Sequence, residues 1–403
     1  MLRATNAVKA KLINLWVVFE AIRINGPVPR TGIADNTGLS KQATSDLVDE
    51  LLELGFVREE KSEERRVGKP PKPIVVNPDG GFTIGFHVDY GRATAVVMNL
   101  GGDVLLREVR PLNSVDATVV AQDLAGSVEG LLARAKIDTE RFLGIGLATP
   151  GPFRVPRMNP PRLPGWDGLV LTQELRRATG LSVALANDGQ CAVTAEWRFG
   201  ASARPLNNFV YLYVGTGLGT GIMIDGTTFG GAHGNAGELG HTIAVPGGHP
   251  CICGKKGCLE TYVSVDSLTR FLAERGVAIA DPRELDERFS AGHPLVAAWI
   301  EEAVEPLRSG INTLENLFDP ETIMFGGNAP EWLIEALIEQ VEPLHISISL
   351  TQRDLPRLLK ADLGADAVAR GAATLPVLAM LNPHYRQLSG NAELPAAGDV
   401  GGK

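Results

Sequence analysis

The spacing of cysteine and histidine in one short segment constrains this chain more than any other feature. Three of the four cysteines, Cys251, Cys253 and Cys258, fall within eight residues, and nine residues separate Cys251 from the preceding His241. Three thiolates and one imidazole are the ligand set of a closed, four-coordinate structural zinc site. The sequence therefore predicts that a zinc ion pins this part of the fold.

Two glycines support the metal site, and two alternatives compete with it. Gly254 and Gly257 lie between the last two cysteines and would let the backbone turn sharply enough to aim every thiolate at one ion. His249 is a rival for the position of fourth ligand. A disulfide with one spare thiol is the other possibility, but an acidic chain without a secretory signal gives it little support.

Size and composition indicate an ordinary globular protein. The chain has 403 residues, enough for two or three domains, with 44% apolar and 21% charged residues. Its longest apolar runs fall short of a membrane span, and its N-terminus lacks the apolar core of a secretory signal. We expect a cytoplasmic protein with no membrane partner.

The negative charge is unevenly distributed along the chain. The net charge is −9 overall, yet residues 1–78 hold 12 Lys and Arg against 10 Asp and Glu, and the remainder holds 26 against 37. The whole chain would repel a polyanion, whereas its first part could approach one.

The first part has the element order of a winged helix-turn-helix domain, which we place at residues 1–78. Helical periodicity covers residues 6–25, a short helix follows at 30–36, and Ser40 is placed to cap a helix that ends near Leu54. Two short strands at 56–58 and 73–76 would then form the hairpin wing. The alternative is a small helical cap used only for dimerisation.

In such a module the start of the last helix enters the major groove, and the wing reaches phosphates or the adjacent minor groove. A few cations and donors at these two places are enough for phosphate contact and base readout. The candidate DNA-binding residues are Lys41, Gln42, Thr44, Ser45, Arg65, Arg66 and Lys69.

From residue 83 onward the sequence pattern predicts strands that alternate with helices, which is typical of an α/β architecture. The expected strands are 84–97 (two strands and a turn), 142–148, 181–185, 209–214, 222–224 and 322–325. The expected helices are 118–135, 189–198, 265–275, 295–316 and 331–342. Functional residues should lie at strand ends and in glycine-rich loops.

Polar and glycine-rich segments follow several of these strands. The loop Gly215–Gly221 has four glycines in seven residues, so its backbone could approach a phosphate or a sugar closely, although a plain tight hairpin is equally consistent. Asp188 could serve as a general base against a substrate hydroxyl, or it could be the N-cap of a helix. Glu238 and Glu260 flank the metal segment and could bind sugar hydroxyls or orient the metal ligands.

Together these segments resemble the ROK family, which groups repressors, open reading frames and kinases that respond to sugars. The resemblance covers about residues 6–380. The residues that carry it are Gly237-Glu238-x-Gly-His241, Cys251-x-Cys253-Gly-x-x-Gly-Cys258-x-Glu260, Asn187-Asp188, the loop Gly215–Gly221, Gly326-Gly327 and Gly364–Ala373.

The resemblance implies an actin-like ATPase body of two α/β lobes with a cleft between them. The first lobe would comprise residues 79–188 and about 365–387, and the second lobe 189–364 with the zinc knuckle. Residues 388–403 have the composition of a disordered tail. The sugar-contacting residues implied are Asn187, Glu238, His241 and Glu260, with Asp188 as the base in a kinase; His241 could serve zinc and sugar through its two ring nitrogens.

One departure from the family pattern bears on catalysis. Kinases of the family begin with a strand that reads Gly-Ile-Asp-Ile-Gly-Gly-Thr, whose Asp and glycines handle ATP phosphates and magnesium. Here His87 stands at the Asp position, Asp89 and Tyr90 stand at the glycines, and Gly91 stands at the Thr. Bulk where a phosphate must sit conflicts with phosphoryl transfer, so we expect no catalytic residue and no kinase activity.

The sequence therefore favours a sugar-responsive transcriptional repressor. It would bind operator DNA as a homodimer or homotetramer, and a sugar or sugar phosphate in the cleft would switch it. The first alternative is an ATP-dependent sugar kinase that carries a DNA-binding domain. A second alternative is a body that serves only as a dimerisation scaffold.

Overall fold

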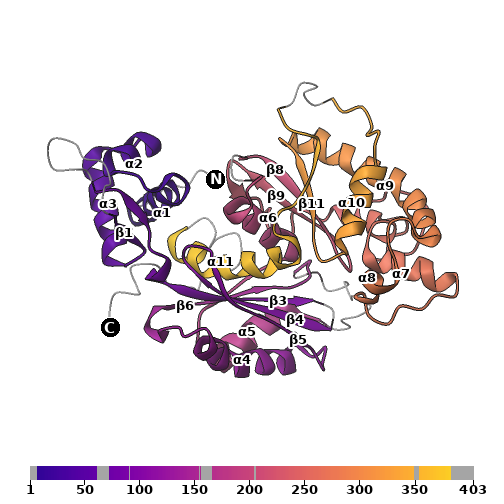
Figure 1. Ribbon diagram of the computed structural model, residues 1–403, viewed down its shortest axis with the longest axis horizontal. Helices are drawn as coiled ribbons and strands as arrows, with labels where there is room; N and C mark the ends of the chain where they lie inside the picture. Colours follow the sequence, from indigo (N-terminus) through magenta and orange to yellow (C-terminus); the bar gives the residue numbers. More distant parts are fainter. Residues whose placement is uncertain are drawn as a thin grey trace.

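The computed structural model describes residues 7–60, 72–89, 91–153, 155, 166–203, 206–348 and 354–382. Within these ranges the chain forms an N-terminal module beside a body built on two separate five-stranded sheets (Figure 1). Several predictions fall on residues outside the described ranges. These are the wing cations Arg65, Arg66 and Lys69, the side chain of Tyr90, and the tail at residues 388–403.

The N-terminal module has the element order that the sequence predicted. Its elements are α1 (Ala7–Asn25), α2 (Arg30–Thr37), α3 (Lys41–Glu53), β1 (Val57–Glu59) and β2 (Ile74–Val76). The two strands pair antiparallel, and an isolated antiparallel β-bridge joins Val28 to Ile74 of β2. The predicted cap is confirmed, because the Oγ of Ser40 accepts the backbone N–H of Ala43 at 3.2 Å.

The module is held together by its own small core and continues without a break into the body. Leu15, Phe19 and Ile22 of α1 are buried against Leu47 and Leu51 of α3. The same apolar cluster includes residues from α11 of the body: Val377, Met380 and Leu381. The module is therefore packed directly on the body.

The first sheet of the body has the strand order β5-β4-β3-β6-β7. Its strands are β3 (Phe82–Asp89), β4 (Arg92–Asn99), β5 (Val104–Pro111), β6 (Phe142–Ala148) and β7 (Val183–Ala186). Helices α4 (Ala117–Arg134) and α5 (Gly168–Thr179) cover one face, and α11 (Ala367–Leu381) covers the other (Figure 1). Short 3-10 turns lie at η1 (Pro78–Gly80), η2 (Thr139–Arg141) and η5 (Gly364–Asp366).

The second sheet has the strand order β10-β9-β8-β11-β12. Its strands are β8 (Phe209–Val214), β9 (Leu218–Ile224), β10 (Thr227–Thr228), β11 (Ile323–Gly326) and β12 (Leu358–Lys360). One face packs on α7 (Val265–Glu274), α9 (Pro294–Phe318) and α10 (Glu331–Gln340), with α8 (Glu284–Arg288) nearby. The other face packs on α6 (Asp188–Phe199). The turns η3 (Leu239–His241) and η4 (Leu259–Thr261) bracket the cysteine segment.

Helices α6 and α11 lie against each other between the two sheets, and glycines let them approach closely. A Cβ on Gly371 of α11 would lie 1.9 Å from the carbonyl oxygen of Cys191 on α6. A Cβ on Gly146 of β6 would lie 1.7 Å from the carbonyl oxygen of Ala372. Any side chain at these glycines would force the layers apart, so both sheets share one tightly packed centre.

Most predicted elements of the body are confirmed with ends shifted by at most two residues, but β9 begins at Leu218, four residues before the predicted start. Three strands (β5, β10 and β12) and three helices (α5, α8 and α11) were missed. Strand β5 is an edge strand whose residues are exposed or half-buried, so its sequence lacks the apolar alternation that marks a strand. No helix in the described ranges is long and apolar enough to cross a membrane.

Candidate metal centre and the adjoining pocket

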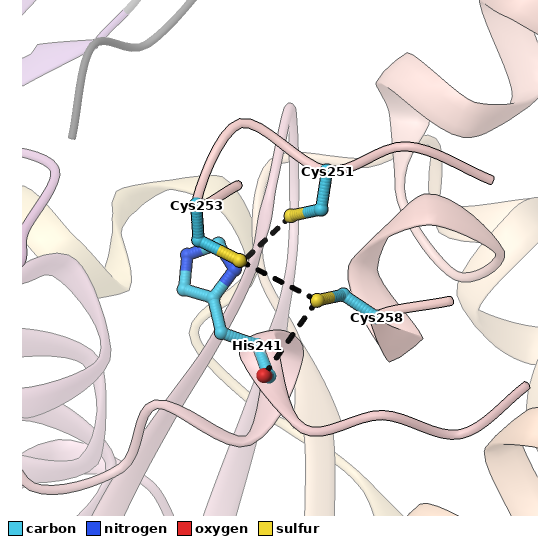
Figure 2. A group of neighbouring side chains, drawn as sticks. All are labelled: His241, Cys251, Cys253 and Cys258. Atoms are coloured by element: carbon cyan, nitrogen blue, oxygen red, sulfur yellow. Dashed lines mark hydrogen bonds between the residues drawn. The ribbon is translucent and has the colours of Figure 1, made fainter. Parts of the chain in front are cut away.

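The predicted metal ligands lie together at one end of the second sheet. His241 on η3 faces Cys251, Cys253 and Cys258, and their ligand atoms all lie within 4.8 Å of one another (Figure 2). The Sγ of Cys251 lies 3.4 Å from Nδ1 of His241, and the Sγ atoms of Cys253 and Cys258 are 3.5 Å apart. Tetrahedral zinc, with bonds of about 2.3 Å to sulfur and about 2.0 Å to nitrogen, spaces its ligands roughly 3.5–3.8 Å apart. The cluster therefore fits a four-coordinate metal ion.

The local backbone explains why these side chains converge. Gly254 and Gly257 adopt left-handed φ values of 85° and 79°. At Gly257 a Cβ would lie 1.6 Å from the carbonyl oxygen of Val245, so only glycine fits. The N–H of Cys251 donates to the carbonyl of Lys255 at 2.9 Å, which closes the knuckle around the thiols. The role predicted for both glycines is confirmed.

The geometry argues against both alternatives for this segment. All four cysteines are free thiols, and a separation of 3.5 Å between the Cys253 and Cys258 sulfurs is far longer than a disulfide bond of about 2.05 Å. His249 lies outside the cluster, with its ring 4.9 Å from the ring of Tyr262. Of the two histidines weighed from sequence, His241 is the one that joins the cysteines.

A pocket adjoins the metal centre, and all five residues proposed for sugar contact line it. Asn187 and Asp188 come from the start of α6, Glu238 and His241 from η3 and its cap, and Glu260 from η4. Asn187 is also the N-cap of α6, because its Oδ1 accepts the N–H of Gln190 at 2.8 Å. The N-cap role that the sequence offered for Asp188 therefore belongs to Asn187, and Asp188 is the first residue of α6 and lines the pocket.

His241 reaches the metal centre and the pocket with different nitrogens. Its Nδ1 faces Cys251, whereas its Nε2 lies 4.0 Å from Oε2 of Glu238. Oε1 of Glu260 lies 4.0 Å from Nδ1. Burial, followed by the positive charge of Lys255, lowers the pKa of His241. A neutral imidazole is the form that binds a metal.

The surroundings of the carboxyl groups in the pocket disfavour their ionised forms. Burial and the neighbouring Glu260 raise the pKa of Glu238 to about 7. Burial also raises the pKa of Glu260, although the N–H of Leu218 donates to its Oε2 at 3.1 Å. Burial, with Asp89 and Glu238 nearby, raises the pKa of Asp188 well above its usual range. Clustered carboxyls of this kind are suited to bind a ligand that donates hydrogen bonds.

Several buried polar atoms around this pocket lack a partner among the described residues. They are Oδ1 of Asp188, Oγ1 of Thr220, the hydroxyl of Tyr213 and Nε2 of His87. Asp188, Thr220 and Tyr213 line the pocket, and Nε2 of His87 lies 3.5 Å from Oδ1 of Asp188. Burial lowers the pKa of His87 to about 4, so the ring is neutral at neutral pH. Unsatisfied buried atoms are costly unless a ligand or water satisfies them.

The glycine-rich loop is a tight hairpin turn that also lines the pocket. The N–H of Gly215 donates to the carbonyl of Gly217 at 2.9 Å, which joins β8 to β9. A Cβ on Gly217 would lie 2.6 Å from Oε2 of Glu260. Gly221 lets α6 approach β9, because its Cβ would lie 2.0 Å from the carbonyl oxygen of Gly189. These glycines are used for close packing around the pocket.

A second, larger cavity of about 1070 Å³ lies beyond the β3–β4 turn. Asp89 at the end of β3 accepts a hydrogen bond of 2.5 Å from Nδ2 of Asn328, which follows β11 in the other sheet. Lys360 in this cavity binds Glu331 and Glu335 at 2.6 and 2.7 Å. Charged and polar groups of this cavity are therefore engaged with one another.

The candidate DNA-contacting residues of α3 separate into exposed and buried members. Lys41 and Gln42 are exposed. Ser45 is half-buried, and its Oγ accepts a hydrogen bond from Nη1 of Arg30 at 2.9 Å. Thr44 is fully buried, so the expectation that it belongs to the exposed face is corrected. Its position one residue before Ser45 turns it toward the module core, near Leu47 and Val48.

Sequence reasoning missed several residues that shape the pocket. Ile252 lines it from between two cysteines, and alternation along the chain could have shown that it points away from the metal. Tyr213 and Thr220 come from strands β8 and β9 and carry no local signal. The contact between Asp89 and Asn328 joins residues 239 positions apart, which a single sequence does not reveal.

Comparison with known proteins identifies the family of this chain. Residues 84–377 match the ROK family. A xylose repressor from Caldicellulosiruptor bescii is 28% identical over 350 residues, which cover 82% of this chain and 88% of the relative.

Two solved structures represent the two branches of that family. A ROK family transcriptional regulator, a homolog of the E. coli MLC protein, aligns with a TM-score of 0.73 and 27% identity over 94% of this chain and 98% of its own. A ROK hexokinase from Thermus thermophilus aligns with a TM-score of 0.58 and 34% identity over 74% of this chain and 98% of its own. Because the family match spans most of the sequence, this chain belongs to the ROK family.

Proposed function

We propose that this protein is a transcriptional repressor that releases operator DNA when a sugar binds in the pocket beside the metal centre. The observation that carries the proposal is the gathering of Asp188, Glu238, His241 and Glu260 around one pocket, with partnerless polar atoms among its walls. Similarity to a transcriptional regulator along 94% of the chain supports the DNA-binding part of the proposal.

The metal in this proposal is a structural zinc ion. His241, Cys251, Cys253 and Cys258 would hold it, and four protein ligands leave no open position for a substrate. Bound zinc supplies rigidity to the knuckle. Glu238 precedes η3 and Glu260 follows Cys258 by two residues, so the fixed knuckle would orient both carboxyls toward the pocket.

Sugar recognition follows from the chemistry of these groups. Each hydroxyl of a sugar ring can both donate and accept a hydrogen bond. Glu238 and Glu260 can accept from them, while a protonated Asp188 could donate or accept. Nε2 of His241 faces the same space from the metal side. A sugar phosphate is the other ligand class that this proposal includes.

We also propose that the body does not transfer phosphate. His87 fills the space beside Asp188 with a neutral ring, and Nε2 lies 3.5 Å from the carboxyl oxygen that a kinase would use as a base. The carboxylate of Asp89 accepts a hydrogen bond from Asn328. These contacts support a binding pocket without the metal-binding carboxylate that phosphoryl transfer requires.

DNA contact would come from Lys41, Gln42 and Ser45 at the start of α3, together with Arg65, Arg66 and Lys69 of the wing. We propose a cytoplasmic homodimer or homotetramer, because paired modules are needed to match two half-sites of an operator. The boundaries at residues 78, 188, 364 and 387 and the disordered tail remain predictions.

The test begins by selecting a DNA duplex from a random pool with the purified protein. Affinity for that duplex is then measured by fluorescence anisotropy with and without D-xylose, D-glucose and their phosphates. We expect one of these sugars to weaken DNA binding, and an Asp188→Asn variant to need more of it. No selected duplex, or no sugar effect with any of the four, would count against the proposal.

The second candidate is a sugar kinase that also binds DNA. Asp188 lies in the pocket, and the chain is 34% identical to a ROK hexokinase over the aligned part. The same protein, mixed with ATP, magnesium and each unphosphorylated sugar, should give no product above a blank without enzyme. Turnover that disappears in Asp188→Asn would establish the kinase instead.

A further inference from the structure

We propose that α6 couples the sugar pocket to the DNA-binding module: its first turn contacts the ligand, and its last turn holds α1 through a buried ion pair. This inference rests on the proposed function and adds the route by which sugar binding reaches the DNA. Four observations support it, one from each end of the helix, one from its sides and one from the linker to the module.

The first turn of α6 forms part of the pocket wall. Asn187 caps the helix, and Asp188 is its first residue; both line the pocket. Oδ1 of Asp188 lies 3.5 Å from Nε2 of His87 but accepts no hydrogen bond from the described residues, so a ligand hydroxyl that reaches this carboxyl would gain a hydrogen bond with the helix itself. A sugar bound at Asp188 therefore acts on the helix end directly.

The sides of α6 pack closely on neighbouring backbone, and the helix joins its two ends as a rigid rod. Gly189 packs against Thr220 of β9, where a Cβ would lie 2.7 Å from the carbonyl carbon. On the opposite side the carbonyl of Cys191 meets Gly371 of α11. At 12 residues the helix spans about 18 Å, and helical hydrogen bonds keep that length fixed.

The last turn of α6 is joined to α1 by charges that are buried. Nη1 of Arg198 donates to Oε1 of Glu20 at 2.8 Å, and both residues are less than a tenth exposed. Nε of Arg23 donates to Oε2 of the same carboxylate at 2.9 Å, while its Nη1 donates to the backbone carbonyl of Arg198 at 3.1 Å. Burial alone would raise the pKa of the Glu20 carboxyl, but Arg198 and Arg23 hold it below its usual value.

Two cation–π contacts also connect α1 with the last turn of α6. The guanidinium of Arg198 lies 5.5 Å from the ring centre of Trp16 on α1, and that of Arg23 lies 5.0 Å from the ring centre of Trp197 on α6. Each helix thus places one arginine over a tryptophan of the other. We call Trp16, Glu20, Arg23, Trp197 and Arg198 the α1–α6 joint.

Close contacts hold the segment that links the module to the body. A Cβ on Gly80 would lie 2.1 Å from the carbonyl oxygen of Gly55, and Nδ2 of Asn77 donates to that same oxygen at 2.9 Å. The end of α3 is therefore fixed to the start of the first sheet. A shift of α6 against that sheet must be absorbed at the joint, where directional ion pairs tolerate little displacement.

The experiment measures a coupling factor, which is the ratio of DNA affinity without sugar to DNA affinity with saturating sugar. The probes are the selected duplex and whichever of D-xylose, D-glucose or their phosphates binds in calorimetry. Glu20→Gln keeps the shape of the joint and removes its charge. We expect sugar affinity to stay within about twofold of wild type while the coupling factor falls at least tenfold.

Glu315→Gln is the matched control. Glu315 is also a buried carboxylate bound by arginine, with Arg357 at 2.8 and 2.5 Å, but it lies on α9, away from the joint. Its coupling factor should match that of wild type. A Glu20→Gln protein that couples as strongly as wild type would overturn the inference and leave the proposed function intact. If no sugar changes the DNA affinity of the wild-type protein, both the inference and the proposed function are wrong.

A second measurement on the wild-type protein covers the case in which Glu20→Gln does not fold. Amide hydrogen exchange is followed with and without the bound sugar. We expect altered exchange in peptides that cover residues 14–24 and 194–200, in addition to the pocket segments 215–221 and 235–262. Protection confined to the pocket segments would overturn the inference.

Discussion

The two cavities of the body differ in what their polar side chains do. Beside the metal centre, Asp188, Thr220 and Tyr213 line a common pocket, and each has a buried polar atom without a hydrogen-bond partner among the described residues. In the larger cavity, Asp281 binds Arg283, Lys360 binds Glu331 and Glu335, and Asp89 binds Asn328. The first cavity can gain hydrogen bonds from a ligand, whereas the second would have to break existing ones. We infer that the pocket beside the metal centre is the one that recognises a ligand.

The largest effect that would sharpen this contrast is expected from loss of the metal. Cys253→Ser should abolish stoichiometric zinc and destabilise the protein by on the order of 4 kcal/mol, because a structural metal contributes directly to folding. Sugar binding should be lost with it. Zinc content is measured by atomic absorption, stability by thermal unfolding and sugar affinity by calorimetry.

Cys191→Ser is the control for that variant, because Cys191 is buried between α6 and α11, outside the cluster. It should keep its zinc and its sugar affinity even if it loses some stability. Unchanged zinc content and unchanged sugar affinity in Cys253→Ser would show that the metal centre is misassigned.

The next effect separates the two cavities by their carboxylates. Glu260→Gln should weaken sugar binding by about 1.5–3 kcal/mol, which is the usual worth of a hydrogen bond to a charged group. Asp281→Asn in the larger cavity should leave sugar affinity unchanged, because that side chain is engaged by Arg283. Calorimetric titration of both variants tests the contrast, and equal losses would break it.

The two cavities should also respond oppositely to pH. The raised pKa of Asp188 means that its protonated form stabilises the fold below about pH 4, and that this contribution is lost as pH rises toward the folded pKa. Asp188→Asn should therefore gain stability over wild type at pH 8 relative to pH 5, by about 0.5–2 kcal/mol. Thermal unfolding at both pH values measures it.

Asp281 provides the opposite sign for comparison. Arg283 lowers the pKa of Asp281 to about 2, so its contribution is present above about pH 4 and disappears only as pH falls toward 2. Asp281→Asn should show no change between pH 5 and pH 8. An Asp188→Asn advantage that shrinks as pH rises would contradict the burial argument.

The smallest effect concerns the contact that joins the two sheets across the larger cavity. Asn328→Ala removes the hydrogen bond to Asp89 and should cost about 0.5–1.5 kcal/mol of stability. Sugar affinity should fall by less than tenfold, because Asn328 itself does not line the pocket and acts on it only through Asp89. A loss larger than that of Glu260→Gln would mean that the second cavity takes part in recognition.

Local patterns in the sequence were enough to predict the cluster of candidate metal ligands and most secondary structure. The ligands fall within 18 residues, from His241 to Cys258, so neighbouring turns bring them together. Helix α3 was predicted by its periodicity and its Ser40 cap, yet Thr44 was placed on the wrong face. A short polar side chain at the edge of an apolar stripe gives no periodic signal of its own orientation.

Contacts between distant residues could not be predicted in the same way. The sequence did not pair Glu20 with Arg198, although they form a buried ion pair 178 positions apart. Edge strand β5 was missed because its side chains are mostly exposed, and its assignment depends on hydrogen bonds with β4. Only the folded chain brings such partners together.

The sequence by itself determined the residues of the candidate metal knuckle, most of the helices and strands, and the residue types available for recognition, because these depend on chemistry within a few turns of chain. Tertiary structure decided which polar groups have partners and which face the pocket, and it placed the end of α6 against α1. Those outcomes depend on the packing of two sheets and two central helices, where backbone approaches through glycine set distances that no local pattern encodes.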